Sequence, residues 1–308
     1  MRYPVLVCAL SVGILGAPRA EAAGVSKGPW IQHVGATSAT VRVEVDPPGP
    51  VTVELAGALD GGTTRSVAAG ETTALHSIVL DGLTPATRYT YTVRAAGESR
   101  VAAFTTAPDK NVPFHFLVYG DNRTDDAAHA AVVRAMTPVK SDFIVNTGDF
   151  VEAGDTPSEW RTFFEIEAPL LRERCLFACI GNHELIGGAG ESFVKYFGPN
   201  ETASGAGPEQ LQGTFRWGSA RFFLVNGMVR YRSGPDRSWL DRVLAQSDDE
   251  KDLVWRIVVT HYGPWSSGPH GDNRELWAAG VVDAFKQHKI DLVIAGHDHI
   301  YERGWADG

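Results

Sequence analysis

Five short apolar runs between residues 114 and 295 are each followed by side chains that commonly bind metals. Short apolar runs bounded by turn residues are typical of buried strands. In layered α/β folds, ligands collect at the carboxyl ends of such strands. We therefore expect five strands to meet at one crevice, formed by the runs Phe114–Tyr119, Phe143–Thr147, Leu176–Ile180, Arg256–Val259 and Leu292–Ala295.

The side chains after these runs are mainly carboxylates and imidazoles, in the segments Gly120-Asp121, Gly148-Asp149, Gly181-Asn182-His183-Glu184, Thr260-His261 and Gly296-His297-Asp298-His299. A single Gly-Asp is more often a turn or a helix cap than a metal site. His297 and His299 are more specific, because side chains two apart in an extended chain point the same way, about 7 Å apart. That separation suits neighbouring ions about 3.5 to 4 Å apart. Since a metal requires several donors at once, five such segments predict a two-metal site rather than satisfied core residues.

The N-terminus has the pattern of a secretory signal peptide over residues 1–22. A positive start at Arg2 precedes a mostly apolar stretch from Val5 to Gly16, and Ala20-Glu21-Ala22 supplies an A-x-A cleavage pattern. The alternative is a membrane anchor, but the apolar run is shorter than the roughly 20 residues that a span requires. We expect a secreted or periplasmic protein with no membrane contact after signal removal.

Charge and cysteine content narrow the classes of partner. The formal net charge is −9, and removing the two arginines and one glutamate of residues 1–22 makes it −10. Nucleic acid and anionic membranes are therefore not expected partners. Of the remaining cysteines, Cys175 and Cys179 would lie about 13 Å apart in a strand, beyond the roughly 7 Å limit of a disulfide. We expect both to be buried thiols, and the sequence indicates no oligomeric state.

Residues 24–107 contain short runs of alternating apolar and polar side chains, separated by turns rich in Pro, Gly and Asp. This pattern is typical of an antiparallel β-sandwich. The segment Leu83–Tyr91 resembles the tyrosine-corner region of fibronectin type III domains. Because this part shows no cluster of acids, bases or metal ligands, we expect a structural module or one that borders the site.

Residues 112–308 have a different pattern, in which strands alternate with helices. Helices are expected over Ala127–Met136, from Thr156-Pro157-Ser158-Glu159 onward, over Ser238–Gln246 and over Arg274–Gln287; the second start has the form of a capping box. The pattern predicts a layered α/β domain whose β-sheets are flanked by helices. Because Gly308 comes only nine residues after His299, we expect this domain to be incomplete at its C-terminus.

The ordered set of motifs resembles the calcineurin-like metallophosphoesterase superfamily over nearly all of residues 112–303. With the preceding sandwich and the ending Gly296-His297-Asp298-His299-Ile300-Tyr301-Glu302-Arg303, it looks most like the purple acid phosphatase branch and its bacterial relatives. The resemblance implies two metal ions. It assigns Asp121 and His299 to the first metal, Asn182, His261 and His297 to the second, and Asp149 to both.

The same resemblance implies two histidines with roles outside the metal shell. His183 would lie beside the metals as an outer-sphere acid. His270, nine residues after His261, resembles a histidine that faces the substrate. The alternative for His270 is an ordinary surface loop histidine.

Two positions depart from the family pattern. Glu152 stands where the purple enzymes carry the tyrosinate that binds ferric iron, so we expect no iron–tyrosinate. The expected metals are Fe, Mn or Zn. Arg123 stands where many members have a histidine ligand, and a guanidinium only donates. The first metal therefore lacks one ligand, binds more weakly, or takes water or Glu152 instead. Arg123 itself either turns toward the substrate phosphate, which its fork fits, or forms an ion pair with Asp125 or Asp126.

The implied activity is hydrolysis of a small phosphomonoester by an exported enzyme, through attack of a metal-bridging hydroxide. Arg123, His183 and His270 would be the catalytic side chains around the metals. Two alternatives remain open. In the first, the same site acts on phosphodiesters or nucleotides. In the second, the chain is a metal-binding module without turnover.

Overall fold

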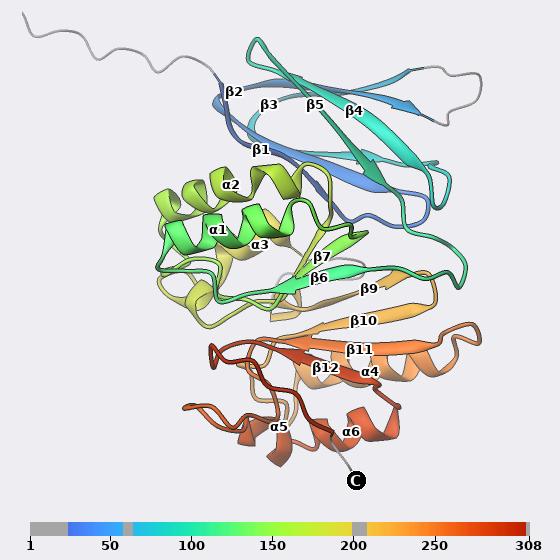
Figure 1. The fold of residues 1–308 in the computed structure, drawn as a ribbon, viewed down its shortest axis with the longest axis vertical. Coiled ribbons are helices and arrows are strands. Elements are labelled where there is room, and N and C mark those ends of the chain that lie inside the picture. The colour runs from blue at the N-terminus through green and yellow to red at the C-terminus, as the bar shows by residue number, and fades with distance from the viewer. Residues whose placement is uncertain (1–23, 58–63, 199–207, 306–308) are drawn as a thin grey trace, which may run out of the picture.

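The computed structural model describes residues 24–57, 64–198 and 208–305. The predicted signal peptide lies outside these residues. Within them, no helix combines the length and the apolar character needed to cross a membrane. The described chain forms a β-rich part followed by a layered α/β part (Figure 1).

The β-rich part is a five-stranded antiparallel sheet of β1 (Gly24–Gln32), β2 (Ala39–Gly57), β3 (Arg65–Leu80), β4 (Arg88–Ala95) and β5 (Glu98–Thr105). The register between β2 and β3 shifts around Gly49, and β2 pairs with β1 before this point and with β4 after it. The sheet thereby covers one apolar core. The predicted all-β first domain is confirmed.

The tyrosine corner predicted in this part has a matching contact. The hydroxyl of Tyr89 accepts a hydrogen bond of 2.9 Å from the backbone N–H of Thr84, the kind of upstream contact that defines such a corner. The likeness to fibronectin type III domains as a whole stays a prediction.

The α/β part contains two separate sheets. The strands β6 (Phe116–Tyr119), β7 (Phe143–Asn146) and β8 (Leu176–Ala178) form a parallel three-stranded sheet. The second sheet has the order β12-β11-β10-β9 and consists of β9 (Gly213–Trp217), β10 (Ala220–Val225), β11 (Trp255–Thr260) and β12 (Leu292–Ala295), of which β9 is antiparallel to β10. All five predicted strands are present, divided between the two sheets.

Stacked aromatic rings fill the space between the two sheets. Phe177 of the first sheet lies parallel to Phe215 of the second, with ring centroids 3.5 Å apart, and Phe215 stacks on Phe222 at 4.4 Å. Cys175 and Cys179, on either side of β8, are free and buried in the same core, as expected. Burial raises the pKa of each thiol to about 12, so both are inert neutral groups.

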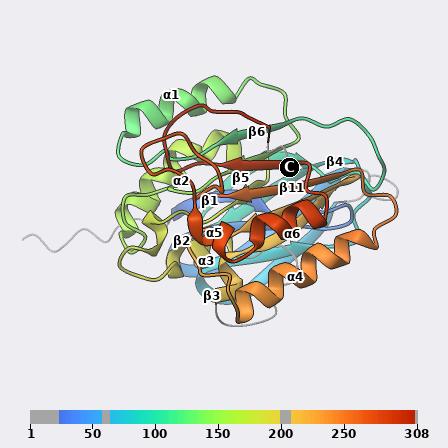
Figure 2. The same cartoon turned by 90° about the horizontal axis from the view of Figure 1, so that it is seen from below.

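Helices cover the outer faces of both sheets, which confirms the predicted class. The first sheet packs against α1 (Asp126–Met136), α2 (Pro157–Leu171) and α3 (Glu191–Phe197). The second packs against α4 (Pro235–Asp248), α5 (Arg274–Ala278) and α6 (Val281–Gln287), which lie next to one another in Figure 2. Two short 3₁₀ helices, His183–Leu185 and Pro208–Leu211, complete the described elements.

Two local helix predictions were wrong. The expected helix over residues 274–287 is broken, because Gly280 adopts φ 68° between α5 and α6. The expected capping box is absent at Thr156, whose side chain makes no cap hydrogen bond. Glu159 instead accepts hydrogen bonds from the backbone N–H groups of Glu152 and Ala153. It therefore holds the loop that follows β7.

The two parts of the chain are joined by a buried arginine. The Arg42 guanidinium in β2 donates to the backbone carbonyls of Lys195 and Tyr196 in α3, both at 2.7 Å, and to the Gln32 side chain at 3.0 Å. Trp30 packs beside it against Phe164 of α2. Burial lowers the pKa of Arg42 to about 10, which leaves it charged at neutral pH.

We predict that Arg42→Met destabilises the protein, because it leaves the carbonyls of Lys195 and Tyr196 without donors. An unsatisfied buried acceptor costs about 1–3 kcal/mol, so the free energy of unfolding in urea should fall by about 2–4 kcal/mol. Arg94→Met is the matched control, since the Arg94–Glu54 pair is exposed, and no measurable change is expected. Equal effects of the two substitutions would contradict the importance of the interface contacts.

Candidate metal centre

The loops after five strands bring all the predicted metal ligands together. Asp121 follows β6, Asp149 follows β7, and Asn182 follows β8 in the first sheet. His261 follows β11 directly, and His297 and His299 follow β12 in the second sheet. The centre therefore lies where the carboxyl ends of strands from both sheets meet.

These ligands form two groups that share Asp149. In one group, Nε2 of His261 lies 3.1 Å from Oδ1 of Asn182, 3.3 Å from Oδ1 of Asp149 and 3.2 Å from Nδ1 of His297. In the other, Asp121, Asp149 and His299 each place one ligand atom within 4.8 Å of the others. The assignment of these groups to two metals bridged by Asp149 stays a prediction.

The donor atoms fit a cation. Nδ1 of His261 lies 2.9 Å from the carbonyl oxygen of Thr147; a carbonyl only accepts, so Nδ1 carries the hydrogen. In the neutral ring, Nε2 then presents a lone pair to the oxygens of Asp149 and Asn182, which are also acceptors. Acceptors that face one another require a proton or a metal between them, and an imidazole oriented by a carbonyl is a common metal ligand. Such N/O donor sets suit Zn, Mn and Fe.

The pKa directions favour the ligand form for Asp149 and His297 but not for Asp121 and His261. Burial raises the pKa of Asp121, and the contact of His261 with Asp149 outweighs burial and raises the pKa of His261. Burial raises the pKa of Asp149, but its contacts with His261 and His183 outweigh burial and hold the pKa well below its usual range. Burial and the neighbouring His261 lower the pKa of His297 to about 4. At neutral pH, Asp149 is therefore ionised and His297 neutral, as metal binding requires.

The backbone is strained at four of the six predicted ligands. Asp121, Asp149, His297 and His299 have φ values of 51°, 59°, 79° and 52°, a region that costs side chains other than glycine about 1–3 kcal/mol and is concentrated at functional sites. The expectation that His297 and His299 lie in extended chain was wrong, since both lie in a turn after β12. Their rings consequently reach different partners, His261 for His297 and Asp121 for His299.

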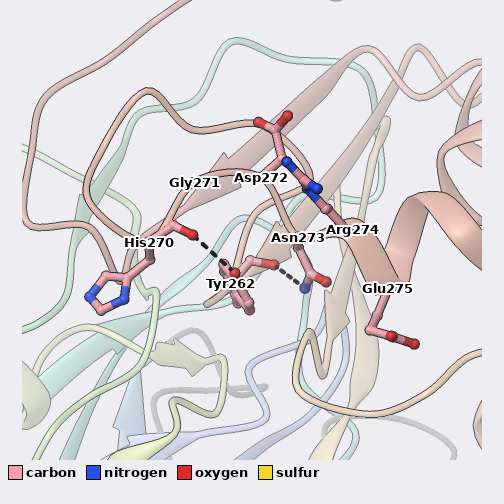
Figure 3. Close-up of a pocket in the computed structure, with 7 residues that line it drawn as sticks. All are labelled: Tyr262, His270, Gly271, Asp272, Asn273, Arg274 and Glu275. Carbon is pink, nitrogen blue, oxygen red and sulfur yellow. Dashed lines mark hydrogen bonds between the residues drawn. The ribbon is translucent and has the colours of Figure 1, made fainter.

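Two further predicted residues border the ligands. The backbone N–H of His183 donates to Oδ1 of Asp149 at 3.1 Å, and its Nδ1 lies 2.7 Å from the carbonyl of Glu152. His270 lies on an exposed loop, yet its ring centroid is 4.2 Å from that of His297. His270 lines an open pocket of about 400 Å³ together with Tyr262 and Arg274 (Figure 3).

A family model of calcineurin-like phosphoesterases matches residues 114–301. The chain belongs to this family. The match covers every ligand and neighbour described above. A second model, for a domain of unknown function (DUF7800), matches residues 22–113.

Individual relatives agree with this membership. Purple acid phosphatase 5 of Arabidopsis thaliana is 25% identical over 238 residues, covering 74% of this chain and 54% of the relative. The Fe(3+)-Zn(2+) purple acid phosphatase 12 of the same plant is 26% identical over 246 residues, covering 74% and 52%. This chain thus spans about half the length of these relatives.

Solved structures agree on the fold. The purple acid phosphatase PPD1 from yellow lupin (Lupinus luteus) seeds superposes with a TM-score of 0.69 at 16% identity, covering 87% of this chain and 57% of that chain. PhoD superposes with a TM-score of 0.67 at 16% identity, covering 91% and 72%. The arrangement of sheets and helices is therefore that of these two structures.

Arg123 is the residue by which we expected this centre to differ from many family members. Its Nε donates to Oδ2 of Asp149 at 3.1 Å, and its Nη1 donates to Glu152 at 2.9 Å. An ion pair was one predicted alternative, but the predicted partners Asp125 and Asp126 were wrong, because Arg123 pairs with Asp149 and Glu152 while the Asp125 carboxylate caps α1. The guanidinium thus contacts the carboxylate oxygen of Asp149 that His261 does not contact, and it pairs with Glu152.

Glu184 supports the centre without being a predicted ligand. Its buried carboxylate accepts hydrogen bonds from the N–H groups of Gly181 at 2.8 Å, Asp149 at 2.9 Å and Phe150 at 2.8 Å. Burial raises the pKa of Glu184 to about 7, with a further rise from the charge of Asp149. A Cβ on Gly181 would lie 2.2 Å from Oδ1 of Asp149, so the two loops fit only with glycine there. The position of Glu184 in Gly-Asn-His-Glu was visible in the sequence, but its hydrogen-bond partners were not.

We predict that Glu184→Gln weakens metal binding, because the amide group would face backbone donors with a donor of its own. Loss of a residue that orients ligands lowers metal affinity by about 10- to 100-fold, and titration of the metal-free protein with Zn²⁺ measures this. Glu250→Gln is the control, since Glu250 pairs with Arg216 and Arg221 at the amino end of β10. Unchanged zinc affinity in Glu184→Gln would remove Glu184 from the support of the centre.

Proposed function

We propose that this chain carries the catalytic centre of an exported, dinuclear metal-dependent phosphatase that hydrolyses small phosphomonoesters. The observation that carries the proposal is the double group of donors around Asp149 in a chain of the calcineurin-like phosphoesterase family. Asp121 and His299 bind the first metal, and Asn182, His261 and His297 the second. The metals are Fe, Mn or Zn, and the signal-like residues 1–22 support export.

Metal ions held by these ligands would supply an activated water at neutral pH and offset the charge of the phosphate. The chain's own residues position and protonate the substrate. Because Nδ1 of His183 is directed at the carbonyl of Glu152, Nε2 is the atom from which this ring donates a proton to the leaving alcohol. Arg123, beside Asp149, and His270, beside His297, would contact the phosphate, and the guanidinium suits phosphate oxygens.

A phosphodiester or nucleotide substrate is the second candidate. The pocket beside His270 is lined by the Tyr262 ring and the exposed Arg274 guanidinium. An aromatic ring and a cation are suited to a leaving group with a base or a further phosphate. Rates with a phosphomonoester, a phosphodiester and a nucleotide on one preparation separate the candidates.

We predict that His297→Ala abolishes metal-dependent hydrolysis of para-nitrophenyl phosphate, because the second metal loses a ligand. Chelation of the wild type should give the same loss, and Zn²⁺, Mn²⁺ or Fe²⁺ should restore activity only to the wild type. Elemental analysis reports the metals bound per chain. His115→Ala is the control, since His115 is an exposed residue before β6. Unchanged turnover of His297→Ala in metal-stripped buffer would refute the proposed centre.

We predict that Arg123→Ala raises KM for phosphomonoesters with metal content retained, because the phosphate loses a charged donor. Hydrogen bonds to charged groups contribute about 1.5–3 kcal/mol, so KM should rise by about 10-fold or more. Arg123→Lys keeps the charge but not the forked donor geometry, so its KM should lie between those of the wild type and Arg123→Ala. A KM equal to that of the wild type, with more metal bound, would assign Arg123 to charge compensation of Asp149 alone.

A further inference from the structure

The loop that carries His270 is wrapped around the side chain of Asp298. Oδ1 of Asp298 accepts a hydrogen bond of 2.9 Å from the backbone N–H of His270, and Oδ2 accepts one from the Ser266 hydroxyl. Ser266 Oγ in turn accepts from the N–H of Gly268 at 3.0 Å. A Cβ on Gly268 would lie 2.5 Å from Cγ of Asp298, so glycine is required where the loop meets the carboxylate.

The other side of His270 is held by Tyr262. Its hydroxyl donates to the backbone carbonyl of His270 at 3.4 Å, the contact drawn as a dashed line in Figure 3. Tyr262 follows His261 directly, and Asp298 lies between His297 and His299. Both contacts to the His270 backbone therefore come from residues adjacent to proposed metal ligands.

The imidazole of His270 depends on these backbone contacts for its position. It is exposed, and among the described residues its ring contacts the ring of His297 but takes part in no hydrogen bond. The two contacts at its backbone, together with the loop around Asp298, therefore determine where the ring lies. The turn that holds His297 and His299 has a contact independent of the Asp298 side chain, from the N–H of Asp298 to the carbonyl of Gly296.

We propose that Asp298 is a positioning residue that fixes the loop of residues 266–270 to the segment bearing His297 and His299, so that His270 faces the substrate phosphate. The inference rests on the proposed phosphatase function. Asp298 acts through His270 and holds neither metal nor phosphate. Removing its carboxylate frees the His270 end of the loop, while Ser266 and Ser267 keep their backbone contacts to Asp272 and Glu302, and it leaves the metal ligands in place.

The test is a double-mutant cycle. Asp298→Ala, His270→Ala and the double variant are compared with the wild type for kcat and KM with para-nitrophenyl phosphate, affinity for inorganic phosphate, and metal per chain. Asp298→Asn keeps an acceptor oxygen for the His270 N–H and serves as the conservative variant. The matched control is Asp291→Ala, since Asp291 accepts from the backbone N–H of Arg256 at the other end of β12.

We expect Asp298→Ala to keep its metals and to raise KM by about 10-fold, because residues in contact are energetically coupled. The same substitution in the His270→Ala background should change KM by less than about 2-fold. Asp298→Asn should recover most of the wild-type KM, and Asp291→Ala should equal the wild type. Additive effects of Asp298→Ala and His270→Ala, or loss of metal in Asp298→Ala, would overturn the proposal.

Failure of the two proposals would look different. If the metal-loaded wild type has no phosphatase activity, the proposed function is wrong. The double-mutant cycle is then evaluated from the affinities for inorganic phosphate. Positioning is supported if Asp298→Ala binds phosphate more weakly than the wild type and the double variant binds it no more weakly than Asp298→Ala. Equal phosphate affinity in all four proteins rejects it.

Discussion

The centre depends on the burial of one charge, the carboxylate of Asp149. The side chain of Asp149 is 1% exposed, and a carboxylate out of water is stable only with several donors or cations around it. His261, the backbone N–H of His183 and the Arg123 guanidinium all approach its oxygens. Its own backbone N–H is fixed by Glu184. Asn182, His297 and Glu152 each contact one of these partners in turn.

The two-sheet core makes that convergence possible. The stacked rings of Phe177, Phe215 and Phe222 fix the distance between the sheets, and such close packing leaves little freedom for one sheet to slide over the other. Asp149 comes from the first sheet and His261 from the second. The contact of 3.3 Å between these two residues therefore depends on the rigid packing between the two sheets.

The sequence predicted the parts of the centre that depend on local pattern. Buried strands ending in Gly-Asp or Thr-His are visible because apolar runs and turn glycines are local features. The pairing of Arg123 with Asp149, the role of Glu184, and the hold of Asp298 on the His270 loop join residues from different loops. No periodicity encodes such contacts. Glu159 is similar, since its spacing suggested a helix cap while its carboxylate reaches back to the preceding loop.

The two proposed metal positions are physically unequal. His261 is fully buried, whereas the His299 side chain is 54% exposed, so charges interact more strongly around the second metal than around the first. Arg123 already places a positive charge 3.1 Å from Oδ2 of Asp149, and it brings Glu152 to itself rather than to the ligands. The first proposed position adds the Asp121 carboxylate to the shared Asp149, whereas the second adds imidazoles and an amide oxygen. The Arg123 guanidinium therefore offsets part of the larger negative charge at the first position, through a contact that the family motifs alone do not reveal.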